Sequence, residues 1–146
     1  PNNFKTTFLL GSLFLQTKNF EKAEKLLSKA VELKSDYADA YNNLGLAYFE
    51  LNEYKKSENC YQKAINIKPE STNAYINIAS LFRKNKKYNE AKIYYEKVLK
   101  KEPNRKEACL GYSKLLLLLG NHKEGLNYMQ KGEGCIKFGQ KKMEII

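Results

Sequence analysis

Apolar residues in this chain recur three and four positions apart, the spacing that places side chains on one face of an α-helix. In the stretch 41–48 these residues are Tyr41, Leu44, Gly45 and Tyr48. A short polar turn at 51–53 follows, and a second stretch then carries Ser57, Tyr61 and Ala64 at similar spacing. The pattern predicts two amphipathic helices joined by a short turn.

This helix-pair pattern repeats every 34 residues along the chain. The three prolines, at positions 1, 69 and 103, share one phase of the period, and Gly11 and Gly45 are one period apart. Aromatic residues follow the same step, in the sets Phe14, Tyr48 and Phe82, and Phe20, Tyr54 and Tyr88. A fixed period of this length is typical of stacked repeats. We therefore predict an all-α fold, a right-handed superhelical solenoid of about four helix-turn-helix units.

The period also sets the expected limits of the units. Residues 1–3 fall in phase as the end of a preceding repeat, so we expect the chain to be a segment of a longer array. The predicted units are 4–37, 38–71, 72–105 and 106–139, the last of them degenerate and including a junction, and a tail at 140–146 follows.

Unit 38–71 resembles a tetratricopeptide repeat, a 34-residue unit with the pattern W-x2-L-G-x2-Y, A-x3-F and P. It supplies, in these places, Tyr41, Leu44, Gly45, Tyr48, Ser57, Tyr61, Ala64 and Pro69. Unit 72–105 supplies Tyr75, Ile78, Ala79, Phe82, Ala91, Tyr95, Val98 and Pro103. The resemblance implies a scaffold for protein–protein interaction, in which the first helix of each pair lines a concave surface.

Composition narrows the other function classes. The longest uninterrupted apolar run, Leu115 to Leu119, is far shorter than the roughly 20 residues that cross a bilayer, so no membrane partner is expected. Three cysteines without metal or redox spacing indicate reduced thiols and a cytoplasmic location. The net charge of +10 comes from lysines interleaved with glutamates, as on solvated helix faces, so nucleic acid is not an expected partner.

The sequence contains no recognisable arrangement of catalytic residues. Its single histidine, His122, occupies the position that aromatic residues hold in the other units, so we expect it to pack rather than to catalyse. A glycine-rich phosphate loop, a nucleophile elbow and a His/Cys metal cluster are all missing from the sequence. We predict that the chain is not an enzyme and takes no metal or cofactor.

Two asparagines are the leading candidates for peptide binding. Asn43 and Asn77 occupy the same position of adjacent units, on the helix face turned away from the pair's seam, where an amide can donate to and accept from a peptide backbone. Here the chain resembles the repeats of the O-GlcNAc transferase family, whose asparagine ladder holds extended peptides. Leu9 and Gly111 interrupt the ladder in the outer units. The alternative is that an asparagine-rich chain placed two amides on a solvated face by chance.

Further candidates share this face or its flank. The predicted peptide-binding set is Phe8, Ser12, Asn42, Asn43, Leu46, Phe49, Asn73, Ile76, Asn77, Ser80, Arg83, Lys84 and Lys114. Its large apolar members are expected to pocket apolar side chains, and its basic members to favour acidic residues. The carboxylate clamp that the family uses for chaperone tails is not expected, because its lysine and arginine positions hold other residues here. Each neutral hydrogen bond contributes about 1 kcal/mol, so we expect micromolar affinity.

Two other functions remain open. The chain is alternatively a substrate-docking segment of a larger enzyme, such as a transferase or an oxygenase. It is alternatively a self-association module that uses Leu115, Leu117 and Leu118, because the run 115–119 is apolar around the whole helix and requires a cover. The tail offers another cover, through Ile136, Phe138, Ile145 and Ile146.

Overall fold

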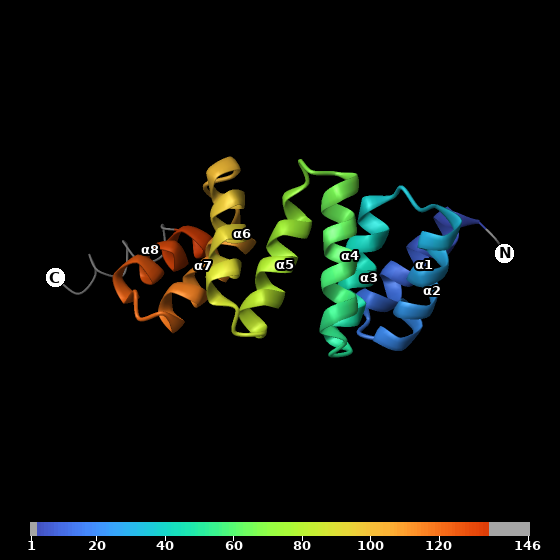
Figure 1. Cartoon of the computed structure of the whole chain (residues 1–146), viewed down its shortest axis with the longest axis horizontal. Coiled ribbons are helices and arrows are strands. Elements are labelled where there is room, and N and C mark those ends of the chain that lie inside the picture. Colours follow the sequence, from blue (N-terminus) through green and yellow to red (C-terminus); the bar gives the residue numbers. More distant parts are fainter. Residues whose placement is uncertain (1–2, 135–146) are drawn as a thin grey trace. The chain divides into compact units, whose positions relative to one another are not determined.

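The computed structural model describes residues 3–134, and this part of the chain is helical without a β-strand (Figure 1). The helices are α1 (Phe4–Gln16), α2 (Phe20–Leu33), α3 (Ala38–Glu50), α4 (Tyr54–Ile67), α5 (Thr72–Lys84), α6 (Tyr88–Lys101), α7 (Lys106–Leu118) and α8 (His122–Glu133). The first helices of the four pairs begin 34 residues apart. The predicted all-α repeat fold is therefore confirmed. The predicted tail at 140–146 lies outside the described residues.

The same three-residue turn closes each helix pair. In the first pair Lys18 has a left-handed φ of 60°, and the next amide, that of Asn19, donates to the carbonyl oxygen of Phe14 at 2.8 Å. This is a Schellman motif, in which a left-handed residue turns the chain and the last carbonyls of the helix are satisfied. The residues with left-handed φ in the four turns are Lys18, Asn52, Lys86 and Gly120. The period thus extends to backbone conformation.

The chain divides into two compact units, one ending at Leu81 and the other starting at Phe82. In the first unit α2 packs between α1 and α3, and its apolar side chains form the core with those of α3. The buried members of this core are Ala23, Leu27, Leu44 and Ala47. Burying a leucine side chain stabilises a fold by about 1.5–3 kcal/mol, so this interface accounts for much of the stability of the unit.

Small residues allow the helices of a pair to approach closely. A Cβ atom added at Gly45 would lie 2.7 Å from the ring of Tyr61, closer than any side chain tolerates. The buried hydroxyl of Ser57, which stands where the family pattern has alanine, donates to the carbonyl oxygen of Gly45 at 2.7 Å. The expected close approach at Gly45 is confirmed, and the hydroxyl of Ser57 is satisfied inside the seam.

In the second unit α7 packs against both α6 and α8. Tyr95 from α6 and Leu116 from α7 are fully buried, and the ring of Tyr112 makes an edge contact with Tyr128 of α8, with centroids 4.9 Å apart. Helix α8 continues through Gly132, because a Cβ atom there would lie 2.7 Å from the side chain of Leu110. Gly132 therefore makes room for a neighbouring helix.

Candidate functional site

Asn43 lies on α3 and contacts the preceding first helix. Its side-chain Nδ2 donates a hydrogen bond to the hydroxyl of Ser12 on α1, 3.0 Å away, and both side chains are half-buried. Asparagine in a helix interior costs roughly 0.6 kcal/mol relative to alanine, because its amide competes for backbone hydrogen bonds. The bond to Ser12 offsets part of this cost and fixes the orientation of the amide.

Asn77 on α5 makes the corresponding contact to α3. Its Nδ2 donates to the Oδ1 of Asn42, 2.9 Å away. A side-chain amide has two N–H groups and two acceptor lone pairs, so one hydrogen bond uses only part of its capacity. Among the described residues, the Oδ1 atoms of Asn43 and Asn77 accept no hydrogen bond. We call the four residues Ser12, Asn42, Asn43 and Asn77 the amide surface.

Two predicted aromatic residues of the first unit already have aromatic partners. Phe8 stacks on Phe4 at a centroid distance of 5.8 Å, and the ring of Tyr37 meets both edge-on. The ammonium group of Lys34 lies 5.2 Å from the Tyr37 ring. This cluster was not predicted, although the aromatic residue next to the start of α3 is a signal for it. Phe49 is half-buried and lies 5.8 Å from the ring of Tyr54.

The other predicted residues of the first unit differ in exposure. Ile76 is only 7% exposed, so it is packed among other side chains and does not form a surface pocket for a peptide. The period could not distinguish it, because the equivalent residues Phe8 and Asn42 are half-buried. Leu46 and Ser80 are half-buried as well, and Asn73 is exposed.

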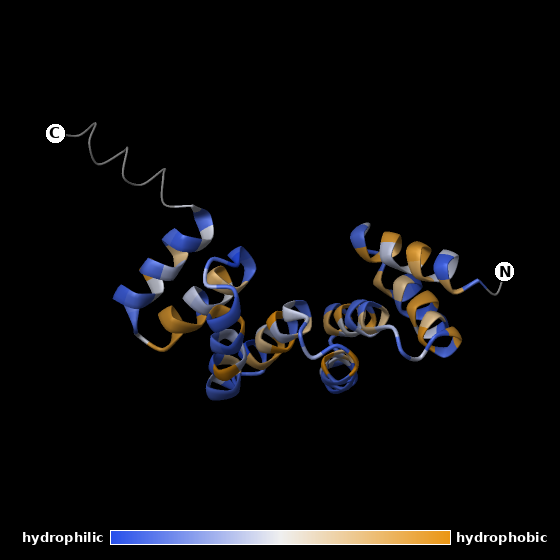
Figure 2. Cartoon of the chain, turned by 90° about the horizontal axis from the view of Figure 1, so that it is seen from above, coloured by the Kyte–Doolittle hydropathy of each residue, from blue (hydrophilic) through white to orange (hydrophobic). Residues whose placement is uncertain are grey.

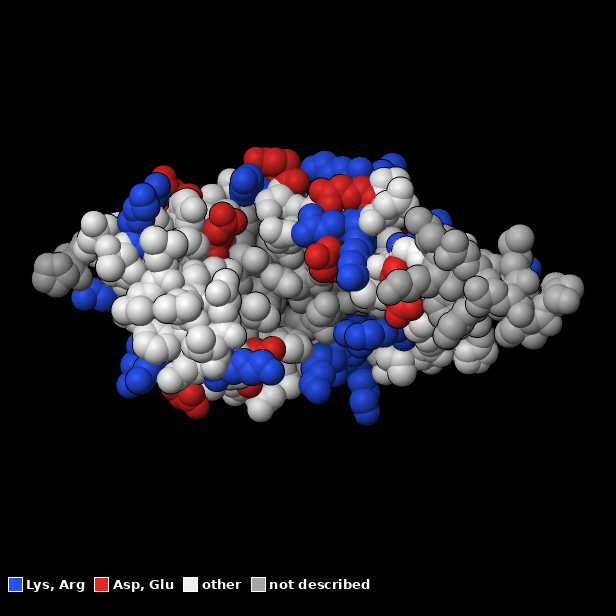
Figure 3. Space-filling view, turned by 180° about the vertical axis from the view of Figure 1, so that it is seen from behind, with Lys and Arg blue, Asp and Glu red and all other residues white. Residues whose placement is uncertain are grey.

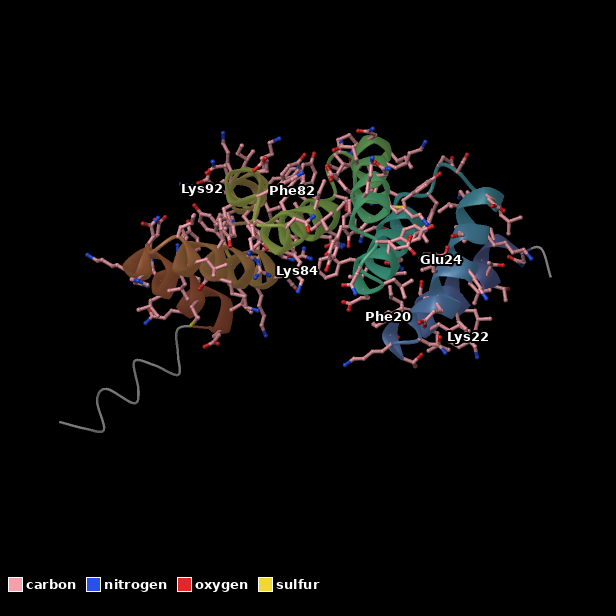
Figure 4. The ribbon with its side chains drawn as sticks, turned by 60° about the horizontal axis from the view of Figure 1, so that its bottom comes forward. Phe20, Lys22, Glu24, Phe82, Lys84 and Lys92 are labelled. Carbon is pink, nitrogen blue, oxygen red and sulfur yellow. The ribbon has the colours of Figure 1, made fainter. Side chains whose placement is uncertain are left out.

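The three predicted basic residues belong to the second unit. Lys84, at the end of α5 (Figure 4), and Lys114, on α7, are exposed. Arg83 is half-buried, and its Nε atom is buried without a hydrogen-bond partner among the described residues. Basic residues outnumber acidic ones about two to one between 82 and 134 but are nearly balanced up to 81. In Figure 3 they are interspersed with acidic residues on the face shown.

Gly111 interrupts the ladder for a steric reason. A Cβ atom at this position would lie 2.5 Å from the ring of Tyr95 and 2.6 Å from its hydroxyl oxygen. The fully buried Tyr95 ring therefore fills the space next to the ladder position of α7. An asparagine cannot occupy this position unless Tyr95 moves.

The residues predicted for self-association are only partly on the surface. Leu115 is fully buried in the second unit and cannot contact a second copy, so its assignment is wrong. Leu117 is half-buried and Leu118 is 60% exposed. The expectation that the run is apolar on all sides and needs a complete cover is also wrong, since α7 already buries Leu115 and Leu116 between its neighbours. The tail residues proposed as a cover lie outside the described residues.

Three features bear on chemistry. His122 is exposed, so the expectation that it packs like the aromatic residues of the other units is wrong. Burial raises the pKa of the Cys60 thiol to about 11, and it also raises the pKa of Cys109, which leaves both thiols protonated at neutral pH. Between residues 3 and 134, side chains of His, Cys, Asp and Glu form no group that could hold a metal ion. None of the described helices has the length and apolarity to cross a membrane.

Comparison with known sequences gives two matches to one family and one to a curated protein. Sequence models of the tetratricopeptide repeat match residues 4–70 and 82–133. The UDP-N-acetylglucosamine–peptide N-acetylglucosaminyltransferase of Caenorhabditis elegans is 42% identical over 48 residues. These residues make up 33% of this chain and only 4% of the transferase.

Solved structures resemble the chain over most of its length. The crystal structure of MamA has a TM-score of 0.79 at 25% identity and covers 99% of this chain and 82% of its own. The tetratricopeptide domain of Arabidopsis OM64 has a TM-score of 0.73 at 24% identity, covering 77% and 93%. The first such domain of Spaghetti (RPAP3), bound to the HSP90 peptide SRMEEVD, has a TM-score of 0.75 at 24% identity, covering 80% and 93%.

Proposed function

Because the chain belongs to the tetratricopeptide repeat family, we propose that it is a protein-interaction scaffold that binds an extended peptide segment of a partner. The carrying observation is the pair of half-buried amides of Asn43 and Asn77, each oriented by a hydrogen bond to the preceding first helix. An oriented amide binds a peptide backbone with a smaller entropic cost than a mobile one. The scaffold has no catalysis of its own.

The spacing of the two amides sets the conformation of the bound peptide. Neighbouring packed helices lie about 8–10 Å apart, and an extended chain advances about 3.3 Å per residue. The amides of α3 and α5 therefore meet backbone groups about three residues apart. In each case the Oδ1 atom accepts from a peptide N–H, and the remaining N–H donates to a peptide carbonyl.

Side chains of the peptide have fewer contacts available than the sequence predicted. Leu46 and Phe49 offer half-buried apolar surface, whereas Ile76 is already packed. Binding thus depends mainly on the peptide backbone and tolerates many sequences, with micromolar affinity. Acidic residues that follow the bound segment are favoured by Lys84 and Lys114 of the second unit, where basic residues are in excess.

A display selection with random 12-residue peptides tests this proposal. The selected peptide is titrated calorimetrically, and its backbone amides are then N-methylated one at a time. We expect two sensitive positions three residues apart, each losing affinity about fivefold, since one neutral hydrogen bond contributes about 1 kcal/mol. Equal affinity for all N-methylated peptides, or a selection without binders, would contradict the proposal.

One observation favours a second candidate, a substrate-docking segment of a larger enzyme. The 48-residue match to a peptide-modifying transferase lies in the repeats, and the amide surface would then hold the segment to be modified. The reading frame beyond residues 1 and 146 tests this candidate. A catalytic domain encoded in the same frame supports it, and a frame that encodes only repeats contradicts it.

A further inference from the structure

The first helix exposes a face that is buried on the equivalent helix of the next pair. Leu10 is 41% exposed and Leu13 is 52% exposed. One period later Leu44 is 4% exposed and Ala47 is fully buried. Figure 2 shows the hydrophobic residues of the helices next to the N terminus. Helix α1 therefore carries the same kind of docking face as α3, but the described residues do not cover it.

On α3 this face is covered by α2. Ala23 and Leu27 of α2 form one core cluster with Leu44 and Ala47 of α3. At the edge of the interface the hydroxyl of Tyr48 donates to Oε1 of Glu24 at 3.2 Å, and Figure 4 shows Glu24 on α2. The face of α1 is thus built to receive the second helix of another pair.

The last helix exposes the complementary face. Leu126 of α8 is 53% exposed and stands three periods after Glu24, on the side that α2 turns towards α3. Gln130 is exposed three periods after Ser28, and Met129, three periods after Leu27, is half-buried. A surface depression on α8 is lined by Lys123, Glu124, Leu126, Asn127 and Gln130.

We propose that α8 of one copy packs on α1 of a second copy, in the way that α2 packs on α3. Transferring the internal contacts by the 34-residue period places Met129 against Leu10 and Leu13, and Leu126 against Phe14. The interface is then mainly apolar. A second copy is the favoured occupant because it continues an interface that the fold already contains and covers exposed leucines at both ends. A preceding helix pair would leave Leu126 exposed.

The contact is head-to-tail, so it does not close on itself after two copies and allows growth with concentration. The docking face of α1 differs from the position of Leu9, which is the equivalent of Asn43, so assembly leaves the amide surface free. Copies in a row would then present several peptide sites to one partner and raise its overall affinity. This last consequence rests on the proposed function, whereas the assembly itself does not.

Two single substitutions at more than half-exposed leucines test the interface in the full chain. Leu13→Lys blocks the α1 face, and Leu126→Lys blocks the α8 face. Multi-angle light scattering should show a wild-type mass that rises with concentration, and each variant alone should stay at the monomer mass of 16.9 kDa. An equimolar mixture of the two variants should give a dimer that does not grow further, because each retains the face that the other lacks.

Ile93→Lys is the matched control, since Ile93 is 52% exposed on α6 and lies outside both faces. It should associate like the wild type, and circular dichroism should show that all variants are folded. A wild-type chain that stays monomeric, as expected if the α1 face receives a preceding helix pair, would overturn the proposal. Loss of assembly in Leu118→Lys but not in Leu13→Lys would overturn it too, because it would place the contact on α7.

Discussion

The side-chain amide of Asn77 on α5 donates a hydrogen bond to Oδ1 of Asn42 on α3, 2.9 Å away. The two residues are 35 positions apart in the sequence, and the bond joins the first helices of adjacent pairs. Asn42 was predicted to contact a peptide directly, but its acceptor oxygen is already used. We therefore interpret Asn42 as a positioning residue that orients the amide of Asn77.

This interpretation predicts different effects for two substitutions of Asn42. Asn42→Ala removes the acceptor, so the amide of Asn77 loses its orientation and affinity for the selected peptide should fall about fivefold, the equivalent of about 1 kcal/mol. Asn42→Asp keeps an acceptor oxygen at the same place and should retain most of the affinity. Calorimetric titration of both variants checks the difference, and equal losses would exclude a positioning role.

The contact between Gly111 and Tyr95 predicts a destabilised variant with a specific rescue. Gly111→Ala places a Cβ atom 2.5 Å from the Tyr95 ring and should lower the free energy of unfolding by about 1–3 kcal/mol. Replacing Tyr95 with leucine creates space at the same place, so the double variant should be more stable than the sum of the single effects requires. Urea unfolding of the four proteins in this cycle measures the coupling. Strict additivity would contradict the steric account.

The left-handed turns predict opposite effects at two equivalent positions. Lys86 has a φ of 61°, which strains an L-residue with a side chain, and Gly120 has a φ of 82° without strain. Lys86→Gly should raise the free energy of unfolding by about 0.5–1 kcal/mol, and Gly120→Ala should lower it by about 1 kcal/mol. Chemical unfolding of both variants tests the signs. A destabilising Lys86→Gly would show that its side chain makes contacts that outweigh the strain.

Burial of Cys60 predicts a slow and pH-dependent thiol. The pKa is raised to about 11, and only the thiolate reacts with iodoacetamide, so alkylation at pH 8 should be about 100-fold slower than for an exposed thiol. The unfolded thiol ionises near pH 8.5, so its contribution to stability is complete below that pH and is lost as the pH rises to about 11. Peptide mapping by mass spectrometry gives the rate at Cys60. Labelling as fast as free cysteine would contradict its burial.

The repeat architecture could be predicted from the sequence because one contact pattern is written several times. Gly45 and Tyr61 meet in the seam, as the small and aromatic positions of the period indicated. The period also predicted helix pairs that begin 34 residues apart. A repeated pattern averages out local exceptions, so the fold follows from it even where single positions depart from the family.

The details of the candidate site could not be predicted in the same way. Asn43 bonds to a residue 31 positions earlier, whereas Asn77 bonds to one 35 positions earlier, so equivalent amides choose different partners. This choice depends on which short side chain the neighbouring helix presents, and a period does not encode it. The burial of Ile76 and the exposure of His122 are likewise set by their own neighbours.

The direct test of the proposed function is a calorimetric titration of the selected peptide with the Asn43→Ala/Asn77→Ala double variant. Asn59→Ala is the matched control, because Asn59 is an exposed asparagine on α4, outside the amide surface. Two lost hydrogen bonds of about 1 kcal/mol each should weaken binding roughly 30-fold in the double variant and leave the control unchanged. Wild-type affinity in the double variant would contradict the account, because the two amides would then not hold the peptide.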